Sequence, residues 1–145
     1  MLRLDEKIKS RHNTFMTITY HTDLFPSDTE MSALMNAAWD DLTPRQYSKI
    51  LDHGLGHICA KQGNRLVGFV NIAWDGGSHA FILDTTVHPE FQRRGIATKL
   101  VKTAIGLARD RGAYWLHVDY EPHLSKFYEG CGFRPSAAGV LRLSE

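Results

Sequence analysis

Features that define several classes of protein are scarce in this sequence of 145 residues. Only two cysteines are present, Cys59 and Cys131, too few for a disulfide framework, so a reducing, cytoplasmic location is expected. No apolar run approaches the roughly 18 residues that a membrane span needs. Residues 1–15 carry charges where a secretory signal would be apolar. We therefore expect neither a membrane protein nor a secreted disulfide scaffold.

A surplus of either charge is also missing. Lys and Arg number 17 against 16 Asp and Glu, for a formal net charge of +1. General binding to polyanions needs an excess of cations along one face, so no nucleic-acid partner is expected. A small nucleic-acid-binding module stays open as a weaker alternative, with a basic stripe of Arg93, Arg94, Lys99 and Lys102.

What the sequence does contain is enough apolar material for one core. Its hydrophobic fraction is 43%, and its length suits a single domain of ordinary size. Residues 1–16 are polar and weakly patterned, so we treat them as an N-terminal extension of uncertain structure. Residues 17–145 form the predicted single domain.

The apolar periodicity predicts alternating strands and helices. Strands are expected at 17–21, 55–62, 65–74, 79–87 and 113–120, with a last strand after Pro135. Helices are expected at 31–39, 44–53, from Ile96 to about Arg109, and at 124–130. This order predicts a mixed α/β fold.

One segment between a predicted strand and the longest predicted helix is suited to phosphate. The first turn of a helix carries unpaired N–H groups and the positive end of the helix dipole. Gly95 and Ala97 leave that turn bare, and Arg93 and Arg94 add cations. Dinucleotide fingerprints and P-loops need glycines and a lysine that are missing here. The segment therefore predicts a pyrophosphate site without nucleotide hydrolysis.

Residues 92–97, Gln-Arg-Arg-Gly-Ile-Ala, resemble the Q/R-x-x-G-x-G/A motif of the GNAT superfamily of acyl-CoA N-acyltransferases. Val87-x-Pro89, Gly68 and the segment 127–133, Phe-Tyr-Glu-Gly-Cys-Gly-Phe, lie where that family has similar features. The resemblance implies a central twisted mixed β-sheet flanked by helices. Within it, the parallel strands 79–87 and 113–120 would splay apart and hold the pantetheine arm of acetyl-CoA between them.

The resemblance also implies a set of site residues. The acetyl-CoA contacts that it implies are Thr86, Val87, Gln92, Arg93, Arg94, Gly95, Ile96, Ala97, Thr98 and Tyr128. A backbone N–H near Val87 would polarise the thioester carbonyl. Tyr128 takes the position of the general acid, because a phenol with a pKa near 10 can protonate a thiolate whose pKa is about 8.5. No metal is expected: His53, His57 and Cys59 have tempting spacing, but Gly54 and Gly56 interrupt the helix that would align them.

A general base is also needed, because an amine is largely protonated at neutral pH. The polar residues on or next to the two splayed strands are Asp84, His117, Asp119 and Glu121. Glu121 is the first choice, and it stands where family members often have Asn. The other interpretation, a solvent-facing carboxylate that caps the following helix, stays open.

The resemblance therefore implies an N-acetyltransferase. It would move an acetyl group from acetyl-CoA to a primary amine of a small molecule or peptide, directly and within a ternary complex. A non-catalytic acyl-CoA-binding sensor of the same fold is the alternative. The acidic residues Asp23, Asp28, Glu30, Asp40 and Asp41 suit a cationic acceptor, and the C-terminal strand offers a route to a homodimer.

Overall fold

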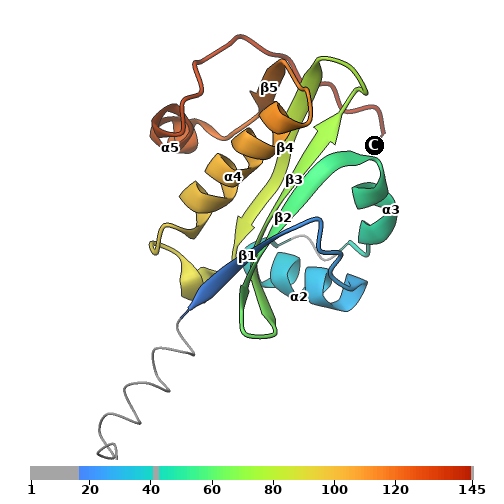
Figure 1. Ribbon diagram of the computed structural model, residues 1–145, viewed down its shortest axis with the longest axis vertical. Helices are drawn as coiled ribbons and strands as arrows, with labels where there is room; N and C mark the ends of the chain where they lie inside the picture. Colours follow the sequence, from blue (N-terminus) through green and yellow to red (C-terminus); the bar gives the residue numbers. More distant parts are fainter. Residues whose placement is uncertain (1–16, 41–42, 145) are drawn as a thin grey trace, which may run out of the picture.

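The computed structural model describes residues 17–40 and 43–144, so the predicted N-terminal extension lies outside the described residues. Five strands form one open sheet in the order β1-β2-β3-β4-β5 (Figure 1). The strands are β1 (Ile18–Thr22), β2 (Gly54–Gln62), β3 (Arg65–Trp74), β4 (His79–Val87) and β5 (Trp115–Val118). Neighbouring strands are antiparallel except β4 and β5, which run parallel. The predicted mixed sheet is confirmed.

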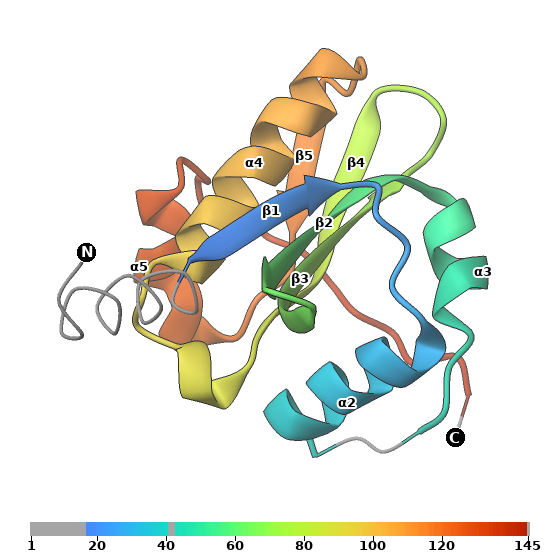
Figure 2. The ribbon, with the colours of Figure 1, turned by 60° about the horizontal axis from the view of Figure 1, so that its bottom comes forward.

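Helices cover both faces of this sheet (Figure 2). The helical segments are α2 (Asp28–Ala38), α3 (Tyr47–Asp52), η1 (Pro89–Phe91), α4 (Ile96–Asp110), η2 (Pro122–Leu124) and α5 (Ser125–Gly130). The longest helix, α4, connects β4 to β5 and lies on one face, whereas α2 and α3 lie on the other. A helical crossover is the usual way to join two parallel neighbours.

Two apolar clusters hold the layers together. The first joins the sheet to α4 and includes Ile58, Val67, Val70, Ile72, Ile82, Ile96, Leu100 and Ala104. The second joins α2 and α3 to the sheet and consists of Met31, Leu34, Met35, Tyr47, Leu51, Cys59, Leu66 and Phe69. Each helix thus buries one apolar face, as its periodicity predicts.

Helix α2 begins at a capping box. The Ser27 hydroxyl accepts a hydrogen bond of 3.1 Å from the Glu30 N–H, and the Glu30 carboxylate accepts one of 2.9 Å from the Ser27 N–H. Each bond satisfies a backbone donor at the helix start, which the helix itself leaves unpaired. The capping residues visible in the sequence therefore determine where α2 starts.

The C-terminal prediction is wrong. Residues 134–144 form neither helix nor strand, and β5 ends at Val118 instead of residue 120. Val140, Leu141 and Leu143 are 84%, 81% and 92% exposed. Strand propensity reflects packing against neighbouring strands, and this segment has no such neighbour in the described structure. The C-terminal strand through which a homodimer was expected to form is therefore not present in the described structure.

Candidate active site

The parallel strands β4 and β5 separate after a short paired stretch. Their register runs from His79 opposite Trp115 to Ile82 opposite Val118, where the pairing ends. Residues 83–87 of β4 continue without β5 beside them. The register between β3 and β4 shifts in the same place, and Asp84 adopts a left-handed φ of 56°. A β-bulge of this kind redirects side chains and leaves backbone groups for other partners.

Thr86 stabilises this bulge through its side chain. Its hydroxyl donates a hydrogen bond of 2.9 Å to the carbonyl oxygen of Asp84 and accepts one of 3.1 Å from the Trp39 indole N–H. The side chain is 1% exposed. Because the side chain is buried and its hydroxyl already bonds to Trp39 and Asp84, Thr86 would contact acetyl-CoA through its backbone.

The loop before α4 has the backbone conformation of an anion site. Arg93 and Gly95 are left-handed, with φ of 62° and 77°, on either side of Arg94. Such local reversals turn successive N–H groups toward one concave surface. A Cβ placed on Gly95 would meet no atom within 4 Å, so the first turn of α4 is open to a phosphate. Residues 92–95 are exposed, while Ile96 points into the core.

Two arginines near the same loop contact one aromatic ring. The guanidinium carbons of Arg94 and Arg65 lie 5.1 Å and 5.3 Å from the centroid of the Phe91 ring. This geometry is that of a cation–π contact, and Phe91 itself is buried. Arg65 was missed in the sequence because it begins β3, far from the motif. Its only local signal is a charge beside a hairpin turn.

Gly68 determines how closely α4 approaches the sheet. A Cβ at this position would lie 3.1 Å from each of three atoms, in Ala60, Ile96 and Leu100. Two of those residues belong to the first turns of α4. Gly68 also pairs with Val87 at the end of β4. The missing side chain therefore lets the N-terminal end of α4 lie against β3 beside Val87.

Tyr128 belongs to α5 and lies in an aromatic cluster. Its ring stacks on Tyr120 at 4.9 Å and makes edge contacts with Phe127 at 4.8 Å and Phe133 at 5.8 Å. Burial raises the pKa of the Tyr128 phenol, and the Thr85 hydroxyl acts in the opposite direction. The phenol is thus held protonated and close to residue 85 of the open β4 edge.

The candidate bases have different surroundings. Asp84 is exposed, yet desolvation by the protein around it raises the pKa of its carboxyl, and the Arg45 guanidinium lowers that pKa. Glu121 is exposed and makes no side-chain bond as the cap of η2. Its neighbour Tyr120 stacks on Tyr128, which brings the end of β5 toward the phenol. His117 is bonded to His79 and stacked on Phe81.

Most of the acidic residues considered for a cationic acceptor have structural partners. Asp23 lies 2.7 Å from the Arg111 guanidinium, which holds the pKa of that carboxyl below its usual range. Asp28 accepts a hydrogen bond from the Tyr47 N–H, and Glu30 belongs to the capping box. Asp41 lies outside the described residues. Asp40 is the one member of this set that is exposed and described without such a bond.

The cysteines and histidines that suggested a metal are bonded elsewhere. His57 lies 2.8 Å from the Leu24 carbonyl oxygen, which also accepts from Cys59. Burial raises the pKa of the Cys59 thiol to about 12. Within residues 17–40 and 43–144, no group of three or more His, Cys, Asp or Glu side chains could hold a metal ion. In the same ranges no helix has the length and apolarity to cross a membrane.

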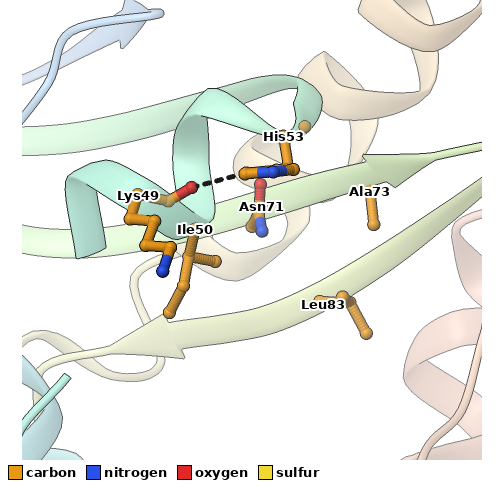
Figure 3. Close-up of a pocket in the computed structure, with 7 residues that line it drawn as sticks. Lys49, Ile50, His53, Asn71, Ala73 and Leu83 are labelled. Carbon is orange, nitrogen blue, oxygen red and sulfur yellow. Dashed lines mark hydrogen bonds between the residues drawn. The ribbon is translucent and has the colours of Figure 1, made fainter. Parts of the chain in front are cut away.

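A cleft opens between α3 and the sheet beside the splay (Figure 3). Its volume is about 370 Å³, and its lining consists of Lys49, Ile50, His53, Gly54, Asn71, Ala73 and Leu83. Asn71 is 2% exposed, and its side-chain oxygen has no hydrogen-bond partner among the described residues. The sequence did not reveal this cleft, because its lining comes from four separate elements.

Comparisons with known proteins agree with this geometry. The acetyltransferase (GNAT) family matches residues 18–133. A mycothiol acetyltransferase of Mycolicibacterium vanbaalenii is 33% identical over 66 residues, which is 46% of this chain and 22% of that protein. The chain thus spans less than a quarter of that relative's length.

Solved structures extend the likeness to most of the chain. A GNAT family acetyltransferase of Streptococcus pneumoniae has a TM-score of 0.75 and 26% identity, covering 88% of this chain and 98% of its own. An aminoglycoside N-acetyltransferase solved in complex with CoA has a TM-score of 0.69 and 18% identity, covering 88% and 95%. At that identity the second likeness concerns the fold alone.

Proposed function

Since the chain belongs to the acetyltransferase (GNAT) family, we propose that it transfers an acetyl group from acetyl-CoA to a primary amine of a small molecule or peptide. The observation that carries this proposal is the loop before α4, with left-handed Arg93 and Gly95 and open space over the helix start. A degenerate relative has no need to keep strained, unblocked backbone there.

The binding of acetyl-CoA would use backbone more than side chains. The N–H groups of residues 93–98 would hold the pyrophosphate, with Arg94 and Arg65 beside it. The open edge of β4 from residue 83 onward would accept the pantetheine arm as an added strand. The N–H near Val87 would then face the thioester carbonyl as a hydrogen-bond donor.

Two proton movements complete the transfer. The amine nitrogen forms a bond to the acetyl carbon as the bond from that carbon to the CoA sulfur breaks. Tyr128 would donate its phenolic proton to the leaving sulfur, since burial keeps it protonated. A carboxylate would take the proton that the amine gives up, so the products are an acetamide and CoA thiol. Proton exchange with water would restore both side chains.

We assign the proton acceptor to Asp84 in preference to the predicted Glu121. Asp84 is exposed, as Glu121 is, but desolvation by the residues around it raises the pKa of its carboxyl, and a carboxylate with a raised pKa is the stronger base. Asp84 also lies one residue from Thr85, which is near Tyr128, so acid and base would approach the reacting atoms from one short segment. Glu121 remains the second candidate, and substitution with the matching amide tests both.

The decisive test combines binding with turnover. Calorimetry should detect acetyl-CoA binding, and Tyr128→Phe should retain that binding while kcat falls about 10²- to 10⁴-fold. Tyr120→Phe is the matched control, because it keeps the aromatic stack and removes a hydroxyl without an assigned role. Folded protein that fails to bind acetyl-CoA would refute the proposal.

The acyl-CoA sensor is the second candidate, favoured only by the retained binding loop. It predicts tight acetyl-CoA binding and no release of CoA thiol with any amine tried. Under that outcome Tyr128→Phe would change neither measurement.

A further inference from the structure

The cleft beside α3 has a lining that favours apolar ligands. Ile50, Ala73 and Leu83 present aliphatic side chains to it, and Lys49 is its only permanently charged residue. Ile50 and Leu83 are 40% and 43% exposed. A volume of about 370 Å³ falls within the range of sites for small ligands. Exposed aliphatic side chains that surround a hollow gain stability when a ligand covers them.

A polar atom in the wall distinguishes this cleft from a packing gap. The Asn71 side chain is 2% exposed, and its amide oxygen lacks a partner in the described part of the chain. Buried polar atoms almost always have one, from protein, water or ligand. Figure 3 shows Asn71 on β3 facing α3 beneath His53. A Cβ on Gly54 would lie 3.1 Å from this oxygen, so the glycine keeps the approach to it open.

The cleft is adjacent to the proposed acetyl-transfer site. Leu83 lines it and directly precedes Asp84, at the point where β4 leaves β5. Arg45, which precedes α3 in the chain, lowers the pKa of the Asp84 carboxyl through its charge. Asp84 therefore lies next to the cleft lining along β4, at the bulge where the strand leaves β5.

On the premise of the acetyltransferase function proposed above, we propose that the cleft receives the hydrocarbon body of a primary monoamine, while Asp84 and the side-chain oxygen of Asn71 accept hydrogen bonds from its ammonium group. Ile50, Ala73 and Leu83 cover the body. Lys49 repels a second ammonium, so polyamines are poor acceptors. The substrate class is thus an amine with an apolar body and a single positive charge.

The test uses unbranched primary amines from ethylamine to hexylamine, with spermidine as the polycation. Release of CoA thiol is measured with acetyl-CoA at saturation. We expect kcat/KM to rise roughly fourfold for each methylene that the cleft covers. Spermidine should react no better than butylamine, although its carbon chain is longer.

A substitution that fills the cleft should remove the preference for longer amines. Ala73→Leu places a larger side chain in the lining, so the ratio of kcat/KM for hexylamine to that for ethylamine should fall toward one. Ala33→Leu makes the same exchange on an exposed position of α2 and should leave the ratio unchanged. The Kd for acetyl-CoA reports whether both variants fold.

Failure of this proposal is distinguishable from failure of the proposed function. An active enzyme with equal kcat/KM for all amines overturns the cleft assignment and leaves acetyl transfer standing. If no amine reacts, calorimetric titration of hexylamine into CoA-saturated protein decides. Binding that Ala73→Leu weakens supports the cleft without turnover, and absence of binding overturns it.

Discussion

The indole N–H of Trp39 donates a hydrogen bond of 3.1 Å to the hydroxyl of Thr86, which in turn donates to the Asp84 carbonyl oxygen. Trp39 directly follows α2, and Thr86 lies near the end of β4. This chain of bonds ties the helix layer to the bulge from which the proposed site opens. It also supports the unusual left-handed backbone of Asp84.

Trp39→Phe should lower the free energy of unfolding by about 1 kcal/mol, because it removes one partly buried hydrogen bond and keeps an aromatic ring. Urea denaturation measures the loss. Trp74→Phe is the control, since it removes an indole bond to the Gly77 carbonyl in an exposed turn. The Trp39 variant should also raise the KM for the acceptor amine. Equal KM values for the amine in both variants would contradict a contribution of Trp39 to the acceptor site.

Gly68→Ala should destabilise the protein by about 1–3 kcal/mol, because its Cβ would press on tightly packed neighbours. Since two of these neighbours belong to the start of α4, acetyl-CoA binding should weaken as well. Gly106→Ala lies within the same helix in open space and should stabilise it by about 0.5–1 kcal/mol. Opposite signs in thermal or urea unfolding would confirm the packing argument, whereas equal effects would contradict it.

Arg94→Glu should raise the Kd for acetyl-CoA by at least about tenfold, because a hydrogen bond to a charged group contributes about 1.5–3 kcal/mol. Calorimetry measures the Kd. Arg109→Glu reverses the same charge at the far end of α4 and should leave the Kd nearly unchanged. Similar losses in both variants would indicate general electrostatic attraction instead of a local site.

Asp84→Asn should stabilise the fold at neutral pH and slow acetyl transfer. Desolvation by the residues around it raises the pKa of Asp84 in the folded protein, so the folded state binds this proton more tightly than the unfolded chain does. The ionised carboxylate therefore destabilises the fold above the raised pKa, and this penalty disappears as the pH falls below the ordinary value of about 3.9. Asn tolerates the left-handed φ of 56°.

The corresponding measurement is urea unfolding of wild type and Asp84→Asn at pH 7 and pH 3, together with kcat. The stability gain should be present at pH 7 and absent at pH 3. Glu121→Gln is the matched control, because it makes the same carboxylate-to-amide exchange at the other candidate base. A loss of kcat in Glu121→Gln and not in Asp84→Asn would return the role of the base to Glu121.

Local pattern was enough to predict most of the sheet, the helix α4 and the loop before it. The turn at Gly95 and the apolar positions of α4, which recur every three to four residues, depend only on residues close in the sequence. Both can therefore be predicted from the sequence. The family resemblance of residues 92–97 and 127–133 added the roles that local physics does not specify. The catalytic role of Tyr128 stays a prediction, because its aromatic cluster is also what packing alone would give.

Contacts between distant parts of the chain decided the rest. Strand propensity around Val140 failed because a strand needs a neighbour, and propensity does not say where one lies. Arg65 lies beside the loop before α4 through contacts with His88, Glu90 and Phe91, and Trp39 contacts the bulge through Thr86. The sequence by itself determined most of the elements and the glycine turn before α4. Tertiary structure alone decided that the pKa of the Asp84 carboxyl is raised and that a cleft lies beside Leu83, because both depend on residues that are far apart in the sequence.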